Sequence, residues 1–397
     1  MRPRFGYALI LGFVGFVTSF GAHIVAVNLP VYAKQVGFGV ALIGVLIAAY
    51  DFAEILAKPV FGVLADRRGM KQTMLAGIAL FIAASLLYPV VNARLLIVVR
   101  FLQGAGAAAL SAVSLALVGT YYESERRGRA YGVYNLIKGA GYVVSPIVGT
   151  AIVWRSNFAT LFLVSAGVGG LALVLAMLLP RTTGTPGALA DDDDGFSLKS
   201  LAVAFKEPTL WPWYIVTVVN MFFVGILFGF LPVRVYALGR GPFVTGMILT
   251  AATASYLVIQ PFAGYLADRV SAAWTIRIGL AAAGLGIILI PLVSGVPLGF
   301  ATALAGLGVG TVWTNTDAVI SRHARAGDLG ATMGLAGSFK EFGDMVGPLL
   351  IGLLSQAFGL TAGFVLCGML GLGSIALIRP ARGYDGNDRE SDHGQTR

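Results

Sequence analysis

Long apolar stretches separated by short polar segments run along almost the entire chain. An α-helix needs about 20 apolar residues to cross the ~30 Å hydrocarbon core of a bilayer. Twelve stretches reach that length, at about 6–33, 39–64, 74–93, 95–120, 129–153, 158–180, 208–236, 243–267, 275–294, 297–322, 330–358 and 360–379. The pattern therefore predicts an all-α membrane protein with twelve transmembrane helices.

One connection is much longer than the others and divides the chain in two. Residues 181–207 contain Thr, Gly and Pro followed by the acidic run Asp191–Asp194. We expect this segment to be a cytoplasmic linker between an N-terminal six-helix bundle, 1–180, and a C-terminal six-helix bundle, 208–379. The polar segment 380–397 is predicted to be a disordered cytoplasmic tail.

The composition excludes several classes of protein. Only 12% of the residues are charged, whereas soluble domains carry about 25%. The single cysteine, Cys367, excludes a disulfide scaffold and a cysteine-ligated metal site. With three His residues and no glycine-rich phosphate loop of the Walker type, the sequence gives no sign of an enzyme, a metal site, a cofactor or ATP-driven transport.

The distribution of Lys and Arg predicts the orientation, because cytoplasmic loops carry an excess of both. With an inside amino terminus, the predicted outer loops hold only Lys34, Arg94, Arg155, Arg234 and Arg240 of the 28 basic residues. Both termini are therefore expected in the cytoplasm. The net charge of +9 reflects this bias. Because the basic residues are dispersed over many loops, no nucleic-acid partner is expected.

The two halves are an internal repeat. A shift of 202 residues superposes one half on the other without a gap. The informative matches are Pro30 with Pro232, Pro59 with Pro261, Asp66 with Asp268, Lys138 with Lys340, and Pro146 with Pro348. Both halves have an even number of spans, so the repeat is parallel. Parallel repeats occur in transporters that hold their substrate between the halves near the membrane midplane.

Four motifs carry a resemblance to a known family. Gly62–Lys71 reads GVLADRRGMK, and a degenerate copy lies at Gly264–Arg269. Arg100–Gly106 reads RFLQGAG, and Gly141–Thr150 reads GYVVSPIVGT. The first segment and its copy resemble the signature loop of the major facilitator superfamily. The segment RFLQGAG resembles the arginine motif of its proton-coupled members, and GYVVSPIVGT resembles the Gly-Pro motif of its drug:proton antiporters. Met70 departs from the signature, where a basic residue is usual. The resemblance covers essentially the whole chain and implies the major facilitator fold.

Glycine and proline at matching positions indicate close helix packing and helix bends inside the bundles. The candidate bend residues are Gly141, Pro146, Gly149, Gly347 and Pro348.

The signature loop implies a conformational latch made of Gly62, Asp66, Arg67, Gly69 and Lys71. By resemblance, Asp66 accepts hydrogen bonds from the amino end of the predicted helix 330–358, where the helix dipole is positive. The alternative is that the basic residues only enforce the positive-inside topology, but topology does not account for Asp66.

Ionisable residues inside a span face the bundle interior and are functional by default, because they are costly in lipid. Asp51, Glu54 and Lys58 lie on one face of the predicted helix 39–64. Glu54 and Lys58 are four residues apart and can pair, which leaves Asp51 without a partner on its own helix. We expect Asp51 or Glu54 to handle a proton or the substrate. The alternative is a structural ion pair between this helix and 330–358.

That second helix contributes Lys340, Glu341 and Asp344. In the structural alternative, Lys340 and Asp344 are the partners that bridge the two helices. Lys340 is the repeat mate of Lys138, which follows Asn135 by one turn. The two lysines either attract an anionic substrate or are neutralised locally, Lys340 by Asp344 and Lys138 by Glu54 or another acid of the helix 39–64.

Three further residues are candidates for the cavity. Arg100 either neutralises a buried carboxylate or snorkels toward the outer surface. Asp317 either faces the substrate or pairs with Arg322. His23 is either a proton relay or a hydrogen-bonded packing residue.

Together these features predict a secondary active transporter that works by alternating access. The resemblance favours proton-coupled efflux of small amphipathic or drug-like molecules, with the proton gradient as the energy source. The alternatives are an organic-anion importer or exchanger, and a lipid transporter on the same fold. The expected setting is the inner membrane of a bacterium, with a small-molecule substrate, the lipid bilayer as surroundings and the monomer as the working unit.

Overall fold

The computed structural model describes residues 6–121, 124–180, 203–324 and 329–378. Within these ranges the first half forms six long helices, α1 (Gly6–Gln35), α2 (Val40–Arg68), α3 (Met70–Leu87), α4 (Leu96–Tyr121), α5 (Ser124–Arg155) and α6 (Phe158–Met177). The second half forms α8 (Trp211–Ala237), α9 (Pro242–Arg269), α10 (Ala272–Leu289), α11 (Val296–His323), α12 (Leu329–Phe358) and α13 (Leu360–Gly373). Two short 3-10 helices, η1 (Ala93–Leu95) and η2 (Ser374–Leu377), and a helical segment at 203–206 are also described. The predicted all-α fold with twelve long helices is confirmed.

Eleven of the described helices are long and apolar enough to cross a membrane by length and composition. The twelfth long helix, α12, has 30 residues but carries Lys340, Glu341 and Asp344 near its middle. These charges lower its apolar character. In the described structure they point into the protein interior between the halves rather than toward lipid.

Local sequence explains where several helices begin and end. Asn157 precedes α6 and accepts a hydrogen bond from the backbone nitrogen of Thr160 at 2.8 Å, which satisfies a free amide of the first turn. Gly69 separates α2 from α3 with a φ of 93°, a conformation that other residues rarely adopt. Short, sharp connections of this kind keep consecutive helices antiparallel.

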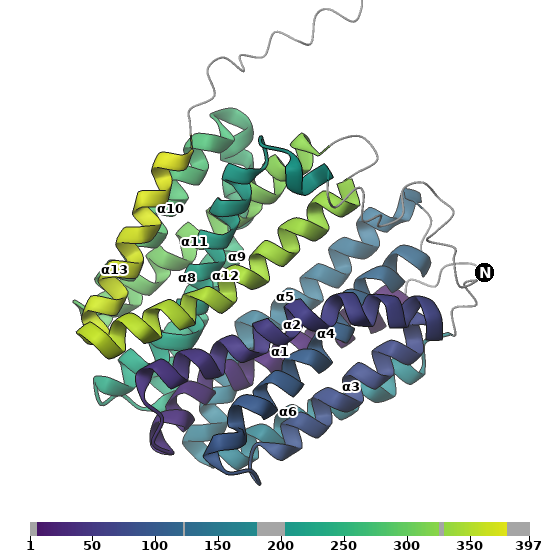
Figure 1. The fold of residues 1–397 in the computed structure, drawn as a ribbon, viewed down its shortest axis with the longest axis horizontal. Coiled ribbons are helices and arrows are strands. Elements are labelled where there is room, and N and C mark those ends of the chain that lie inside the picture. The colour runs from purple at the N-terminus through teal and green to yellow at the C-terminus, as the bar shows by residue number, and fades with distance from the viewer. Residues whose placement is uncertain (1–5, 122–123, 181–202, 325–328, 379–397) are drawn as a thin grey trace, which may run out of the picture.

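The two halves repeat the same packing. In the first half α1 packs against α5, α2 against α4, and α3 against α4 and α6. In the second half α8 packs against α12, α9 against α11, and α10 against α11 and α13. These are the pairs that a parallel sequence repeat predicts, and Figure 1 shows the two bundles side by side.

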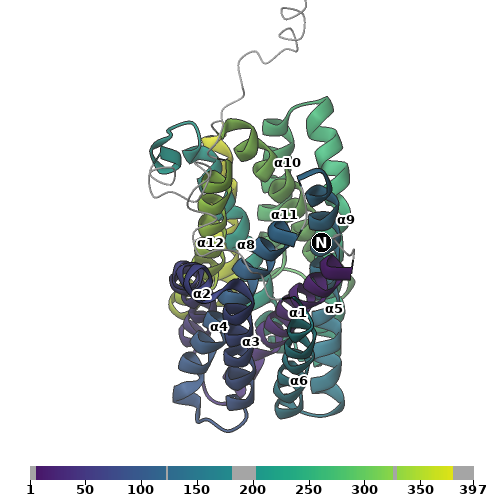
Figure 2. The same ribbon diagram turned by 90° about the vertical axis from the view of Figure 1, so that its right-hand side faces the viewer.

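The two largest contacts between the halves are equivalent: α2 with α12, the α2–α12 seam, and α5 with α9, the α5–α9 seam. A smaller contact joins α1 to α8. Figure 2 shows the first pair on its left and the second on its right. Glycines allow the close approach. A methyl group at Gly44 would lie 2.3 Å from the backbone oxygen of Pro348, and one at Gly246 would lie 2.9 Å from that of Pro146.

Both seams are tight at one end only. Farther along α2, a methyl group added at Gly62 would meet nothing within 4 Å. At its repeat mate Gly264, a methyl group would meet only Thr314 of the same half, at 3.8 Å. The halves therefore touch near Gly44 and Gly246 and diverge toward the end that carries the 62–71 loop, as Figure 1 also shows.

Candidate functional site

A cavity of about 730 Å³ lies between the halves and is lined by α1, α2, α4 and α5 from one half and α8, α9, α11 and α12 from the other. Most of the ionisable residues that the sequence singles out line it: His23, Asp51, Glu54, Lys58, Arg100, Lys138, Lys340, Glu341 and Asp344. Asp317 lies behind this wall and pairs with Lys340. The side chain of Asn135 is outside the described part of the chain.

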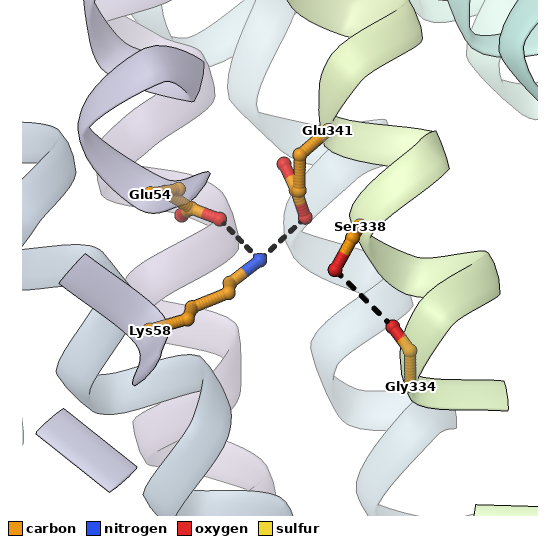
Figure 3. A network of polar contacts seen from close by, with 5 residues as sticks. All are labelled: Glu54, Lys58, Gly334, Ser338 and Glu341. Atoms are coloured by element: carbon orange, nitrogen blue, oxygen red, sulfur yellow. Dashed lines mark hydrogen bonds and ion pairs between the residues drawn. The ribbon is translucent and has the colours of Figure 1, made fainter. Parts of the chain in front are cut away.

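Three of these residues form an ion cluster that joins the halves (Figure 3). The Nζ atom of Lys58 lies 2.7 Å from Oε2 of Glu54 on the same helix and 2.6 Å from Oε1 of Glu341 on α12. The i, i+4 pair is the one expected from the sequence. The bridge between α2 and α12 also exists, but the prediction that Lys340 and Asp344 make it is wrong.

Lys340 turns away from the seam. Its Nζ lies 2.7 Å from Oδ2 of Asp317 on α11 and 5.0 Å from the ring centroid of Trp313. The expected pair of Lys340 with Asp344 is therefore wrong, although the two are one turn apart. The structure favours Asp317 because α11 brings its carboxylate and an aromatic face to the same lysine. Oδ1 of Asp344 stays buried without a hydrogen-bond partner.

Lys138 differs from its repeat mate. In the described part of the chain its ammonium group makes no ion pair or hydrogen bond within normal distances, although it lines the cavity. Glu54, which the sequence offers as one neutralising partner of Lys138, forms its ion pair with Lys58 and attracts Lys138 only from a distance. Lys138 thus presents its amino group to the cavity.

Arg100 is buried, with 3% of its surface exposed. Its Nη1 donates to Oε1 of Gln103 at 2.8 Å, and its guanidinium lies 4.2 Å from the ring centroid of Tyr50. Gln103 is held in turn by the hydroxyl groups of Tyr88 and Ser85. The snorkelling alternative is excluded by this network. No carboxylate among the described residues lies within ion-pair distance of Arg100.

Gln103 belongs to the motif that contains Arg100 but was not predicted to have a role of its own. Its position three residues after Arg100, on the same helix face, is the signal that could have identified it. Gly104, the next residue, allows the close approach of α4 to the backbone of Tyr50, because a methyl group there would lie 2.3 Å from that backbone oxygen.

Aromatic side chains line the other side of the cavity. His23 lies between Tyr142 and Phe228, with ring centroids 4.2 Å and 4.9 Å away. Its Nδ1 lies 2.7 Å from the backbone oxygen of Ser19. A carbonyl only accepts hydrogen bonds, so a neutral His23 carries its proton on Nδ1 and keeps a lone pair on Nε2. Tyr256 and Trp313 form a second aromatic pair at 5.7 Å.

These aromatic residues escaped the sequence analysis, because 24 Phe and 14 Tyr spread along apolar helices carry no positional signal.

The predicted latch is described only in part. The side chain of Asp66 and the start of its expected partner region, 325–328, lie outside the described residues. Lys71 donates to the backbone oxygens of Met177, at 2.7 Å, and Leu179, so its described contacts tie α3 to the end of α6. Arg67 is exposed, as a residue that sets topology would be.

The predicted bend residues mainly serve close packing. A methyl group at Gly141 would lie 3.0 Å from the backbone of α1, and one at Gly149 would lie 2.6 Å from Ile24 of the same helix. In the second half, a methyl group at Gly347 would lie 2.4 Å from the backbone oxygen of Phe222 on α8. Pro146 and Pro348 lie inside α5 and α12, and the backbone oxygen of Pro146 accepts a hydrogen bond from Thr150 at 2.7 Å.

The sequence matches a model of the Major Facilitator Superfamily over residues 11–241 and 214–395. The chain belongs to this superfamily. It is therefore a multi-pass membrane transporter of small molecules, and its resemblance to the drug:proton antiporter group is confirmed by its relatives.

The chain is 26% identical to the multi-drug resistance efflux pump PmrA of Streptococcus pneumoniae serotype 4, over 89% of this chain and 90% of that protein. It is also 26% identical to the multidrug resistance protein MdtL of Shigella flexneri serotype 5b, over 80% and 81% of the two chains. Among solved structures, a bacterial homologue of the human lysosomal transporter Spinster matches with a TM-score of 0.78 and 14% identity, over 95% and 97% of the chains. At that identity the likeness concerns the fold.

Proposed function

We propose that this transporter exports small amphipathic or drug-like molecules in exchange for protons, by alternating access. Its similarity to PmrA and MdtL, which are named for multidrug resistance, extends over most of each chain and supports this direction of transport. The proton gradient is the proposed energy source.

The observation that carries the proposal is the composition of the cavity wall. Carboxyl groups on α2 and α12 face a space whose other walls include Tyr142, Phe228 and Trp313. Apolar and aromatic surface binds varied amphipathic molecules without strict geometry. Buried carboxyl groups exchange protons more readily than exposed ones near neutral pH, because burial disfavours their charge.

The positive-inside bias supports an orientation with both termini in the cytoplasm of a bacterial cell. In that orientation the cavity opens toward the cytoplasm, because the halves diverge at the end that carries the 62–71 loop. A substrate would then enter from the cytoplasm or the inner leaflet. We propose the monomer as the working unit, since the cavity lies between two halves of one chain.

Purified protein in proteoliposomes tests this function. Ethidium serves as the transported probe and pyranine inside the vesicles reports proton movement. Imposing a proton gradient should drive ethidium against its own gradient, with proton flux in the opposite direction. Leu163→Ala, a change on an exposed position of α6, is the matched control and should behave as the wild type. Ethidium flux without proton movement would contradict proton exchange.

One observation favours a second candidate, transport of organic anions. Lys138 lines the cavity with no direct partner among the described residues. If an anion binds there, Lys138→Gln should weaken binding of an anionic probe such as fluorescein and leave ethidium binding unchanged. For the proposed efflux function we expect the wild type to bind ethidium more tightly than fluorescein.

A further inference from the structure

Two carboxyls of the cavity wall, Asp51 and Asp344, fall at the same level of the α2–α12 seam by the register of the two helices. Near Gly44, α2 touches α12 between Pro348 and Gly352. Asp51 is seven residues farther along α2, two turns and about 10 Å away on the same face. The helices run antiparallel, so the matching position on α12 lies one to two turns before that contact. Asp344 is at that position, and both residues line the cavity.

Neither carboxyl has a cation of its own. Within the described residues, Asp51 makes no ion pair or hydrogen bond, and Oδ1 of Asp344 is buried without a partner. The nearest cation on these helices, Lys58, is already engaged by Glu54 and Glu341.

The other charged and titratable groups around the pair do not neutralise it. Arg100 of α4 attracts Asp51 from a distance but donates its hydrogen bond to Gln103. Glu54 and Glu341 repel both aspartates, and Asp51 repels Asp344. The remaining titratable groups that line the cavity are Tyr50 of α2, His23 of α1, Lys138 and Tyr142 of α5, Tyr256 of α9 and Lys340 of α12.

We propose that Asp51 and Asp344 form a carboxyl pair that shares one proton across the seam and is the proton-binding site of the transporter. Two adjacent carboxylates without a cation repel each other, and one proton removes this repulsion by making a carboxylic acid that donates to the other carboxylate. The pair therefore joins the halves when it holds a proton and separates them when it loses it. Its role in coupling rests on the proposed function, whereas its sharing of a proton does not.

Infrared spectroscopy of the purified protein tests the pair without any substrate. Wild type should show the carbonyl band of a carboxylic acid at neutral pH, and its titration should give two well-separated steps. Asp51→Asn and Asp344→Asn should each remove the band at neutral pH, because either change abolishes the repulsion that retains the proton. Glu207→Gln, a carboxyl change outside the cavity, is the control and should leave the band intact.

Three results would contradict the proposal that Asp51 and Asp344 share a proton. The band could survive at full strength in one single variant, which would assign the proton to one carboxyl alone. Both carboxyls of the wild type could titrate in one step. Addition of Na⁺ at constant pH could remove the band, which would make the pair a cation site. The titration of the wild type does not depend on whether the variants fold.

A transport assay distinguishes a failure of the carboxyl pair from a failure of the proposed function. In the ethidium assay, each single Asn variant should lose at least tenfold in proton-driven uphill flux. If the infrared results hold but wild type moves no probe in exchange for protons, the pair stands and the proposed function fails. If exchange is proton-driven while the band survives in one single variant, the function stands and the pair fails.

Discussion

The α2–α12 and α5–α9 seams have the same backbone packing and opposite chemistry. Across the repeat, Glu54 corresponds to Tyr256, Lys58 to Gln260, Glu341 to Gly139, Asp344 to Tyr142 and Asp51 to Thr253. The glycines and prolines that let the helices approach occur in both seams. The ion cluster and the unpaired carboxyls occur in the α2–α12 seam alone among the described residues.

The difference distinguishes residues that are needed for close helix packing from residues that carry titratable groups. Close packing is needed wherever the halves touch, so both copies of the repeat retain small residues there. Under the proposed function, titratable groups are needed only where a proton is handled, and in the other seam tyrosines occupy the positions of two carboxylates. One seam thus carries charged side chains, and the other carries aromatic ones in their place.

The largest expected effect comes from breaking the ion cluster. Lys58→Met leaves Glu54 and Glu341 without their cation, which should cost about 3 kcal/mol of stability and most of the transport. Gln260→Met, the matching change in the α5–α9 seam, removes only a neutral hydrogen bond to Tyr256 and should cost about 1 kcal/mol. Thermal unfolding can be followed by modification of Cys367, the single and fully buried cysteine.

A triple variant sharpens this test. Lys58→Met combined with Glu54→Gln and Glu341→Gln removes all three charges and should recover most of the lost stability. Equal stability of Lys58→Met and Gln260→Met would show that the two seams do not differ in this way.

The next effect concerns packing, where a methyl group should destabilise either seam. Gly44→Ala should lower stability by about 1–3 kcal/mol, because its methyl group meets a backbone oxygen that cannot move away. Gly246→Ala should cost somewhat less, since the backbone oxygen of Pro146 is farther away, at 2.9 Å, and the nearer Thr150 side chain can change rotamer by giving up its hydrogen bond. Gly170→Ala, with nothing within 4 Å, is the control. A harmless Gly44→Ala would refute the tight seam.

The symmetric lysines should respond differently. Lys340→Met strands Asp317 and should cost about 1–2 kcal/mol, which the double change Lys340→Met with Asp317→Leu should recover. Lys138→Met strands no carboxylate in direct contact and should leave unfolding unchanged or raise the unfolding temperature. The same cysteine assay measures all three variants. A stability loss in Lys138→Met that matches Lys340→Met would contradict the asymmetry.

The smallest effect is expected in the aromatic seam. Tyr142→Phe and Tyr256→Phe each remove one hydroxyl group and should weaken ethidium binding about threefold, in line with the loss of one weak hydrogen bond. Neither change should alter the carboxylic acid band in the infrared spectrum. Fluorescence titration measures the affinity, and a change in the band would mean that the two seams are not chemically separate.

The sequence predicted those features of the fold and the site that depend on a single helix or on the internal repeat. Helix positions followed from apolar length, the packing of the halves from the repeat, and the Glu54–Lys58 pair from i, i+4 spacing. Contacts between helices were not predictable in the same way. Lys340 and Asp344 satisfy the same spacing, yet Lys340 pairs with Asp317 because α11 presents a carboxylate and Trp313 together. The relative rotation of two helices, which also brings Glu341 to Lys58, is not encoded in the spacing of either one.

The loose packing of the described atoms around Gly62 and Gly264 has a consequence for the balance between conformations. A transport cycle must close this end of the molecule when it opens the other, so the two end states use different glycines for helix contact. A methyl group that costs one state about 1.4 kcal/mol changes the ratio of the two states tenfold. Alanine at Gly44 therefore biases the population away from the state described, and alanine at Gly62 biases it toward that state. Methyl groups at the two ends therefore shift the same conformational equilibrium in opposite directions.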